Sequence, residues 1–185
     1  MCDPTFLNMQ KEFKSNPSTI TNSLNLSALS CFKTMELLHD EHGEEFIDWL
    51  ISYHILASTT LELFGKLKIA KRHFKNDGSI TELLEKFTNF SHELHKLYST
   101  NGLGTDFMKA VGIQEVKLIN KKREAYRYEF ILQFEKKPII VYNPESLKYW
   151  TMSTKRQNFS VATYQTTHLL NLCKKVQEAS YNDDI

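Results

Sequence analysis

The spacing of apolar residues predicts a chain built mainly from α-helices. The strongest element runs from about Glu44 to Lys75, where apolar side chains recur at intervals of three, four and seven residues. This periodicity is typical of a helix that buries one face. The predicted buried face comprises Leu56, Leu63, Leu67, Ala70 and Phe74. An earlier helix is predicted from Ser27 to about His39, and Gly43 separates the two helices.

A third helix is predicted after the turn sequence "NDGS". Ser79 and Glu82 have the spacing of a capping box, in which each side chain accepts a hydrogen bond from the backbone N–H of the other residue. If the helix continues through Ser91, it buries one face made of Leu83, Phe87, Phe90, Leu94 and Leu97. The same geometry directs His92 and His95 away from that face.

The apolar pattern changes to a period of two in "YRYEFILQF", where Tyr126, Tyr128, Phe130, Leu132 and Phe134 alternate with other residues. This alternation is typical of a β-strand. The connection "EKKP" leads to a second apolar run, so a β-hairpin is predicted at residues 124–143. A short helix is predicted at residues 105–110, and the helical period returns after Ser160 with Leu169, Leu172, Cys173 and Val176.

Together these elements predict a mainly α fold, an up-and-down helical bundle with an added β-hairpin. Residues 1–26 are predicted to form a short helix and a polar connector that contains Pro17. Residues 27–185 are predicted to form a single domain, because the chain is too short for two large ones. One shared core is expected to contain Leu63, Leu67, Phe87, Leu94 and Leu172.

Composition places the predicted bundle in the cytoplasm. The 23 basic and 22 acidic side chains give a net charge of +1, so no overall field draws the protein to nucleic acid or to a membrane. No run approaches the roughly 20 apolar residues of a membrane-spanning helix, and no secretory signal is present. The three cysteines are far apart in sequence, which argues against a disulfide framework. We therefore expect a reducing compartment and no contact with a membrane.

Basic residues gather near the end of the Glu44–Lys75 helix, where Lys68, Lys71, Arg72 and Lys75 share one side. Basic residues three and four positions apart on a helix can follow a phosphate backbone, so these four are candidate ligand-binding residues for a nucleotide or nucleic acid. The alternative interpretation is a solvated face that covers the bundle.

Two groups of residues were considered as metal ligands. Glu36, His39 and His42 include one Glu-x-x-His element, but a carboxylate-bridged di-iron bundle requires two such elements and two further glutamates. His92 and His95 supply only two ligands, and no cysteine lies nearby in the sequence. The sequence therefore predicts no metal site and no cofactor.

The middle of the chain resembles the HEPN superfamily of helical proteins. In that family a long helix bears a glutamate and a downstream lysine, which here match Glu62 and Lys66. A following helix begins near a His-acidic-Leu triplet, which here matches His92, Glu93 and Leu94. The resemblance covers residues 27–100 at most.

The resemblance implies a helical bundle that is often a homodimer and that serves either as a metal-independent ribonuclease or as a non-catalytic module that binds nucleotides or partners. Catalytic members carry an arginine shortly before the histidine, whereas the sequence before His92 contains Lys86 and no arginine. Lysine lacks the bidentate geometry of arginine. We therefore expect a non-catalytic binding module, and the alternative is a ribonuclease that uses His92 with Lys86 or Arg72.

Overall fold

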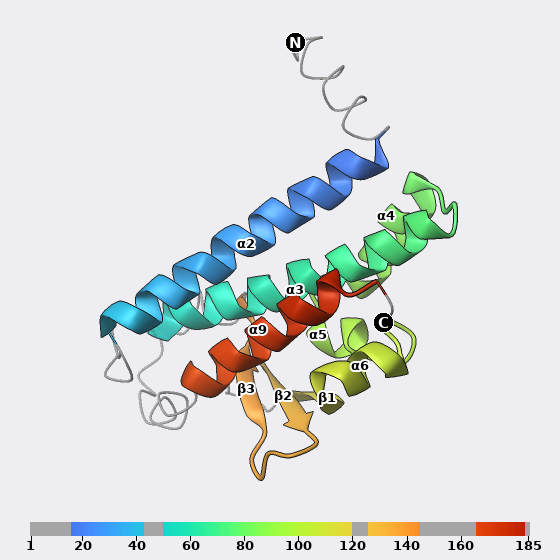
Figure 1. The fold of residues 1–185 in the computed structure, drawn as a ribbon. Helices are drawn as coiled ribbons and strands as arrows, with labels where there is room; N and C mark the ends of the chain where they lie inside the picture. Colours follow the sequence, from blue (N-terminus) through green and yellow to red (C-terminus); the bar gives the residue numbers. More distant parts are fainter. Residues whose placement is uncertain (1–15, 43–49, 120–125, 145–165, 184–185) are drawn as a thin grey trace.

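The computed structural model describes residues 16–42, 50–119, 126–144 and 166–183. Its helices are α2 (Pro17–His42), α3 (Leu50–Lys75), α4 (Ile80–Phe90), α5 (Leu94–Leu97), α6 (Thr105–Val111) and α9 (Thr166–Tyr181). Its strands are β1 (Ile113–Ile119), β2 (Arg127–Leu132) and β3 (Ile139–Tyr142). The predicted mainly helical fold with a β-hairpin is confirmed (Figure 1). The short helix expected before residue 15 and the predicted helical residues 44–49 and 160–165 lie outside the described residues.

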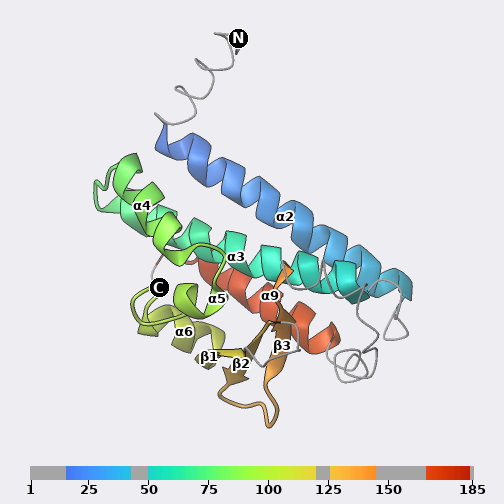
Figure 2. The ribbon, with the colours of Figure 1, turned by 180° about the vertical axis from the view of Figure 1, so that it is seen from behind.

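Helix α3 occupies the centre of the fold. Helices α2 and α9 lie along it, and α5 and β3 contact it from the side of the sheet (Figures 1 and 2). Residues on several of its faces are therefore buried, including Phe64, Ile69 and Ala70, which point in three different directions around the helix axis. The prediction of one buried and one solvated face is wrong for this helix, because neighbours surround it.

Helix α2 begins within the stretch that was predicted as a polar connector, so the proposed boundary between residues 26 and 27 falls inside a continuous helix. Pro17 occupies the first helical position, where the missing N–H costs no hydrogen bond. The Asn16 side chain accepts a hydrogen bond from the backbone N–H of Ser18 at 3.0 Å. An asparagine followed by proline therefore starts the helix instead of marking a loop.

The third predicted helix is divided at Ser91: α4 ends at Phe90, and the short α5 begins at Leu94, three residues after Ser91. The capping box of Ser79 and Glu82 at the start of α4 is confirmed. Ser91 has a positive φ of 49°, which breaks the regular helical path. The residues that follow therefore turn toward α3 and do not extend the face of α4.

The predicted hairpin of β2 and β3 is confirmed, and the structure adds β1 as a third antiparallel strand that the sequence pattern missed. The register of β1 shifts between Ile113 and Glu115, which interrupts the alternation of buried and exposed positions. Polar side chains also occupy much of this edge strand. The residues of β1 therefore show no regular alternation of apolar and polar side chains in the sequence.

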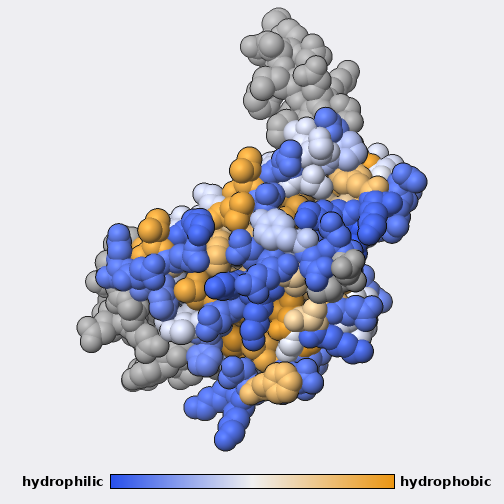
Figure 3. All heavy atoms as spheres, viewed as in Figure 1, coloured by the Kyte–Doolittle hydropathy of each residue, from blue (hydrophilic) through white to orange (hydrophobic). Residues whose placement is uncertain are grey.

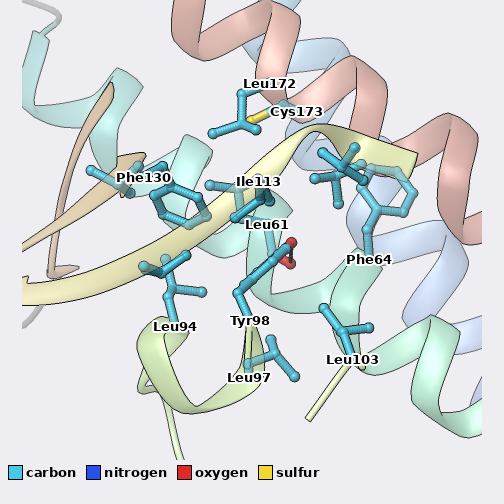
Figure 4. Close-up of a cluster of buried hydrophobic side chains, with 14 of the residues drawn as sticks. Leu61, Phe64, Leu94, Leu97, Tyr98, Leu103, Ile113, Phe130, Leu172 and Cys173 are labelled. Carbon is cyan, nitrogen blue, oxygen red and sulfur yellow. Dashed lines mark hydrogen bonds between the residues drawn. The ribbon is translucent and has the colours of Figure 1, made fainter. Parts of the chain in front are cut away.

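The core joins α3, α5, α9 and the sheet (Figure 4). Leu67, Leu94 and Leu172 are fully buried as predicted, whereas Leu63 and Phe87 are partly buried and pack against the cluster. None of the described helices combines the length and hydrophobicity needed to span a membrane.

His54 is a buried histidine on α3 whose ring meets Tyr142 of β3 edge to face at 5.1 Å. Within the described part of the chain, neither ring nitrogen has a hydrogen-bond partner. Burial disfavours the charged ring and lowers the pKa of His54 from 6.5 to about 4.

We expect Leu67→Ala to lower the free energy of unfolding by about 2 to 5 kcal/mol, because it removes a fully buried side chain and leaves a cavity. Chemical denaturation would measure the change. Leu84→Ala is the matched control, because Leu84 is 43% exposed and should cost much less. Equal losses in the two variants would contradict the placement of Leu67 in the core.

We expect His54 to make stability depend on pH between about 7 and about 4. The unfolded chain binds a proton at His54 near pH 6.5 and the folded chain only near pH 4, so stability is lost as pH falls through this window. The loss attributable to this residue should approach about 3 kcal/mol. The measurement is denaturation at several pH values for the wild type and His54→Leu. Parallel pH profiles of the two proteins would contradict the expectation.

Candidate functional site

The residues that carry the family resemblance meet in space. The Lys66 ammonium donates to Glu62 Oε1 at 2.6 Å along α3. His92 Nδ1 lies 2.9 Å from the same oxygen and 3.0 Å from Glu62 Oε2. One carboxylate therefore holds both a lysine and a histidine that is 30 residues away in sequence.

The break between α4 and α5 brings His92 to this position. The backbone N–H of Ser91 donates to the carbonyls of Phe87 and Thr88, which closes the end of α4. The N–H of Glu93 then donates to the Phe90 carbonyl at 3.0 Å, and α5 begins at Leu94. His92 thus lies in a tight turn beside α3.

The site exposes its histidine and covers its other two residues. The side chain of His92 is 74% exposed, compared with 14% for Glu62 and 13% for Lys66. The Lys66 ammonium also lies 5.5 Å from the centre of the Phe87 ring. With Nδ1–H donated to Glu62, Nε2 of His92 is the ring nitrogen available for proton exchange.

The sheet supports the backbone at His92. The Tyr128 hydroxyl donates to the His92 carbonyl at 3.3 Å, and the Asn143 amide donates to the Tyr128 hydroxyl at 3.1 Å. Burial raises the pKa of Tyr128, and the hydrogen bond from Asn143 opposes that effect. His95, which the sequence directs away from the apolar face of the predicted helix, is half-buried and stacks against the Tyr128 ring. The strand pattern identified Tyr128, but no sequence signal linked it to His92.

Lys86 and His92 contact different parts of α3. The Lys86 ammonium donates to Nδ1 of His73 at 3.3 Å, and Nε2 of His73 donates to the Ser79 carbonyl at 2.7 Å. His73 is eleven residues beyond Glu62, which corresponds to about 16 Å along the helix axis. The structure therefore does not bring together the Lys86 and His92 of the ribonuclease alternative.

Arg72 also lies away from His92. It donates to the Leu103 carbonyl and lines an open hollow of about 400 Å³ together with His73, Lys86 and Phe90. Arg72 and Lys86 are thus neighbours of one another at the far end of α3. The predicted partnership of Arg72 with His92 has no contact in the described residues to support it.

Two of the four residues of the predicted basic stripe contact the end of α9. Lys68 is buried and donates to the Asn182 carbonyl, while Lys71 donates to the Ser180 carbonyl at 3.4 Å and lies over the Tyr181 ring. The carbonyls at a helix C-terminus need donors and favour cations, which explains this arrangement. Burial lowers the pKa of Lys68, and Arg72 adds to the effect. The alternative interpretation of these residues as a solvated face is therefore wrong for Lys68, which is buried. Lys75, at the end of α3, is exposed.

Glu36 and His39, whose spacing suggested a metal-binding element, contact other groups. Glu36 accepts from Lys33 at 2.7 Å, and Nε2 of His39 lies 3.1 Å from the Thr167 hydroxyl. In the part of the chain that the structure describes, no group of three or more His, Cys, Asp or Glu side chains is arranged to hold a metal ion.

Comparison with models of protein families, with curated proteins and with solved structures finds no match for this chain.

Proposed function

We propose that the protein is a HEPN-like, non-catalytic helical module that binds nucleic acid or nucleotides. The observation that carries the proposal is the engagement of His92 by Glu62, which also binds Lys66. Cleavage of a phosphodiester requires groups that transfer protons and a cation that stabilises the charge of the transition state. In this site the nearest lysine is already neutralised by the carboxylate.

The positions of the other cations support the same proposal. Lys86 and Arg72 lie at the far end of α3, and each donates to another group of the protein. A histidine without a facing cation can still take part in binding, because its ring donates and accepts hydrogen bonds at the surface. Binding is therefore the activity that these residues support best.

A metal-independent ribonuclease that uses His92 is the second candidate. The favouring observation is the contact between Glu62 and Nδ1 of His92, since a carboxylate in this position orients a histidine and leaves Nε2 to act as a base. In a ribonuclease of this kind, the cation that stabilises the transition state would have to come from a partner or from ions around the substrate.

The proposal places the module in the cytoplasm as a homodimer. Cys31 and Cys173 are free thiols, which agrees with a reducing compartment. On α2, Leu26 and Leu37 are 67% and 62% exposed and lie eleven residues apart, so they share one face of the helix. Figure 3 shows hydrophobic side chains along the exposed edge of this helix. Pairing of two copies through α2 would cover them.

We expect the purified protein to bind labelled RNA in the presence of a chelator without cleaving it. His92→Ala should leave both the fold and the RNA intact, because among the described residues no cation other than the Glu62-bound Lys66 lies beside His92. Fluorescence anisotropy would report binding, and gel electrophoresis would report cleavage. His39→Ala is the control for removal of a histidine elsewhere.

Two results would decide against the proposal. Cleavage that disappears in His92→Ala at unchanged stability would establish the ribonuclease instead. The absence of any binding to RNA or nucleotides would remove the nucleic-acid association altogether.

We expect a homodimer at protein concentrations of roughly tens of micromolar, as measured by analytical ultracentrifugation. Leu26→Glu combined with Leu37→Glu should produce a monomer, because it buries two charges in the proposed interface. Leu84→Glu changes an exposed leucine on α4 and should leave the dimer unchanged. A monomeric wild type would refute the self-association.

A further inference from the structure

The tip of the β2–β3 hairpin presents an aromatic side chain to solvent. Phe134 is 89% exposed, more than any other large hydrophobic residue in the described part of the chain. The hairpin projects from the body of the molecule in Figure 1, and Figure 3 shows hydrophobic atoms at its free end beside hydrophilic ones. The predicted strand continued to Phe134, but β2 ends at Leu132 and the turn directs this ring outward.

The strand ends that flank the turn are anchored, so the exposed ring has a defined position. Leu132 and Ile139 are 7% and 3% exposed and belong to the core. The N–H of Gln133 donates to the Gly112 carbonyl at 2.9 Å, which ties the start of the turn to the end of α6. An exposed aromatic on a well-anchored turn is available as a contact and loses little conformational freedom on binding.

Lysines lie in this turn and also line the neighbouring hollow on the α9 side. Lys136 and Lys137 are exposed in the same turn as Phe134, and Lys174 and Lys175 are exposed on the adjacent α9. Two carboxylates, Glu135 and Glu178, accompany the four lysines. Since the whole chain carries a net charge of only +1, positive charge is concentrated here.

A hollow of about 210 Å³ lies between the hairpin and α9. Its lining includes apolar side chains from the core, Leu132, Ile139 and Leu172, together with the polar Asn171 and His168. His168 Nδ1 lies 3.7 Å from Glu135 Oε1 at the rim. The hollow therefore combines apolar contact area with hydrogen-bonding groups.

We propose that this hairpin-tip surface, formed by Phe134, the lysines 136, 137, 174 and 175, and the adjoining hollow, binds single-stranded nucleic acid. An unpaired base stacks on the Phe134 ring, and the lysines contact the flanking phosphates. Asn171 supplies donors and acceptors for the edge of a neighbouring base. The inference rests on the nucleic-acid association proposed above and assigns it to a surface remote in sequence from His92.

The chemistry of the surface favours nucleic acid over an anionic membrane. A membrane-binding tip gains affinity by inserting several apolar side chains, whereas this turn offers a single aromatic ring. A hollow with an amide and a histidine suits the hydrogen-bonding edges of bases. Duplex nucleic acid should bind more weakly, because its bases are already stacked.

The first experiment removes the ring. Anisotropy of a labelled single-stranded RNA should show at least about fivefold weaker binding for Phe134→Ala, and Phe134→Tyr should retain wild-type affinity. With 2-aminopurine in the RNA, the wild type should quench the fluorescence by stacking and Phe134→Ala should not. Leu84→Ala is the matched control, because it truncates another exposed hydrophobic residue.

The second experiment removes charge. Lys136→Gln combined with Lys137→Gln should weaken binding and lower the slope of log affinity against log salt by about 1.4. Lys109→Gln combined with Lys117→Gln removes two exposed lysines elsewhere and should leave the slope unchanged. Circular dichroism would confirm that every variant is folded.

The results of these binding experiments distinguish the hairpin-tip surface from the binding function proposed for the whole module. Binding to RNA that is unaffected by the tip variants overturns the hairpin-tip surface and leaves the binding module intact. No binding to RNA or nucleotides overturns both. Binding to anionic phospholipid vesicles that depends on Phe134, without binding to RNA, identifies the tip as a membrane contact and overturns the inference.

Discussion

The burial of α3 on several sides is the constraint on which the rest of the structure depends. A surrounded helix gains stability when its polar side chains meet matching groups, because an unpaired polar group in the interior destabilises the fold; His54 is an exception on this helix. Lys68 donates to the C-terminal carbonyls of α9, and His73 donates to the Ser79 carbonyl. The hydroxyl of Tyr98, the residue that follows α5, donates to the Leu61 carbonyl at 2.8 Å (Figure 4). Polar contacts of α3 thus determine how α4, α5 and α9 dock.

The candidate site is a consequence of the same constraint. Glu62 is largely covered, and its carboxylate is satisfied by Lys66 on its own helix and by His92 from the turn after α4. This contact also fixes the break at Ser91 against α3. The contact therefore both stabilises the fold and presents His92 at the surface, and among the described residues Lys66 is the cation that shares the Glu62 carboxylate with this exposed histidine.

The sheet and hairpin give the molecule a surface that differs from the helical face. Tyr128 donates to the His92 carbonyl and is itself held by Asn143, while the opposite end of the same hairpin carries Phe134 and its neighbouring lysines. One hairpin thus supports the candidate site at its base and offers a separate contact at its tip. In our proposal the binding function is distributed over both.

The sequence by itself determined the features that depend on neighbouring residues. The capping box of Ser79 and Glu82, the short helix α6 and the β2–β3 hairpin follow from local spacing and turn chemistry, and the structure confirms them. The contact between Glu62 and Lys66 is likewise set by helical spacing. A local pattern contains all the information that these features need.

Only the tertiary structure decided which groups meet across the fold. Helical periodicity could not show that α9 covers Lys68, that a positive φ at Ser91 turns His92 to Glu62, or that Lys86 binds His73 instead. The edge strand β1 escaped detection because its bulge interrupts the alternation. These features depend on contacts between segments distant in sequence, whose pairing is settled by the packing of the whole core and not by the spacing of residues within one segment.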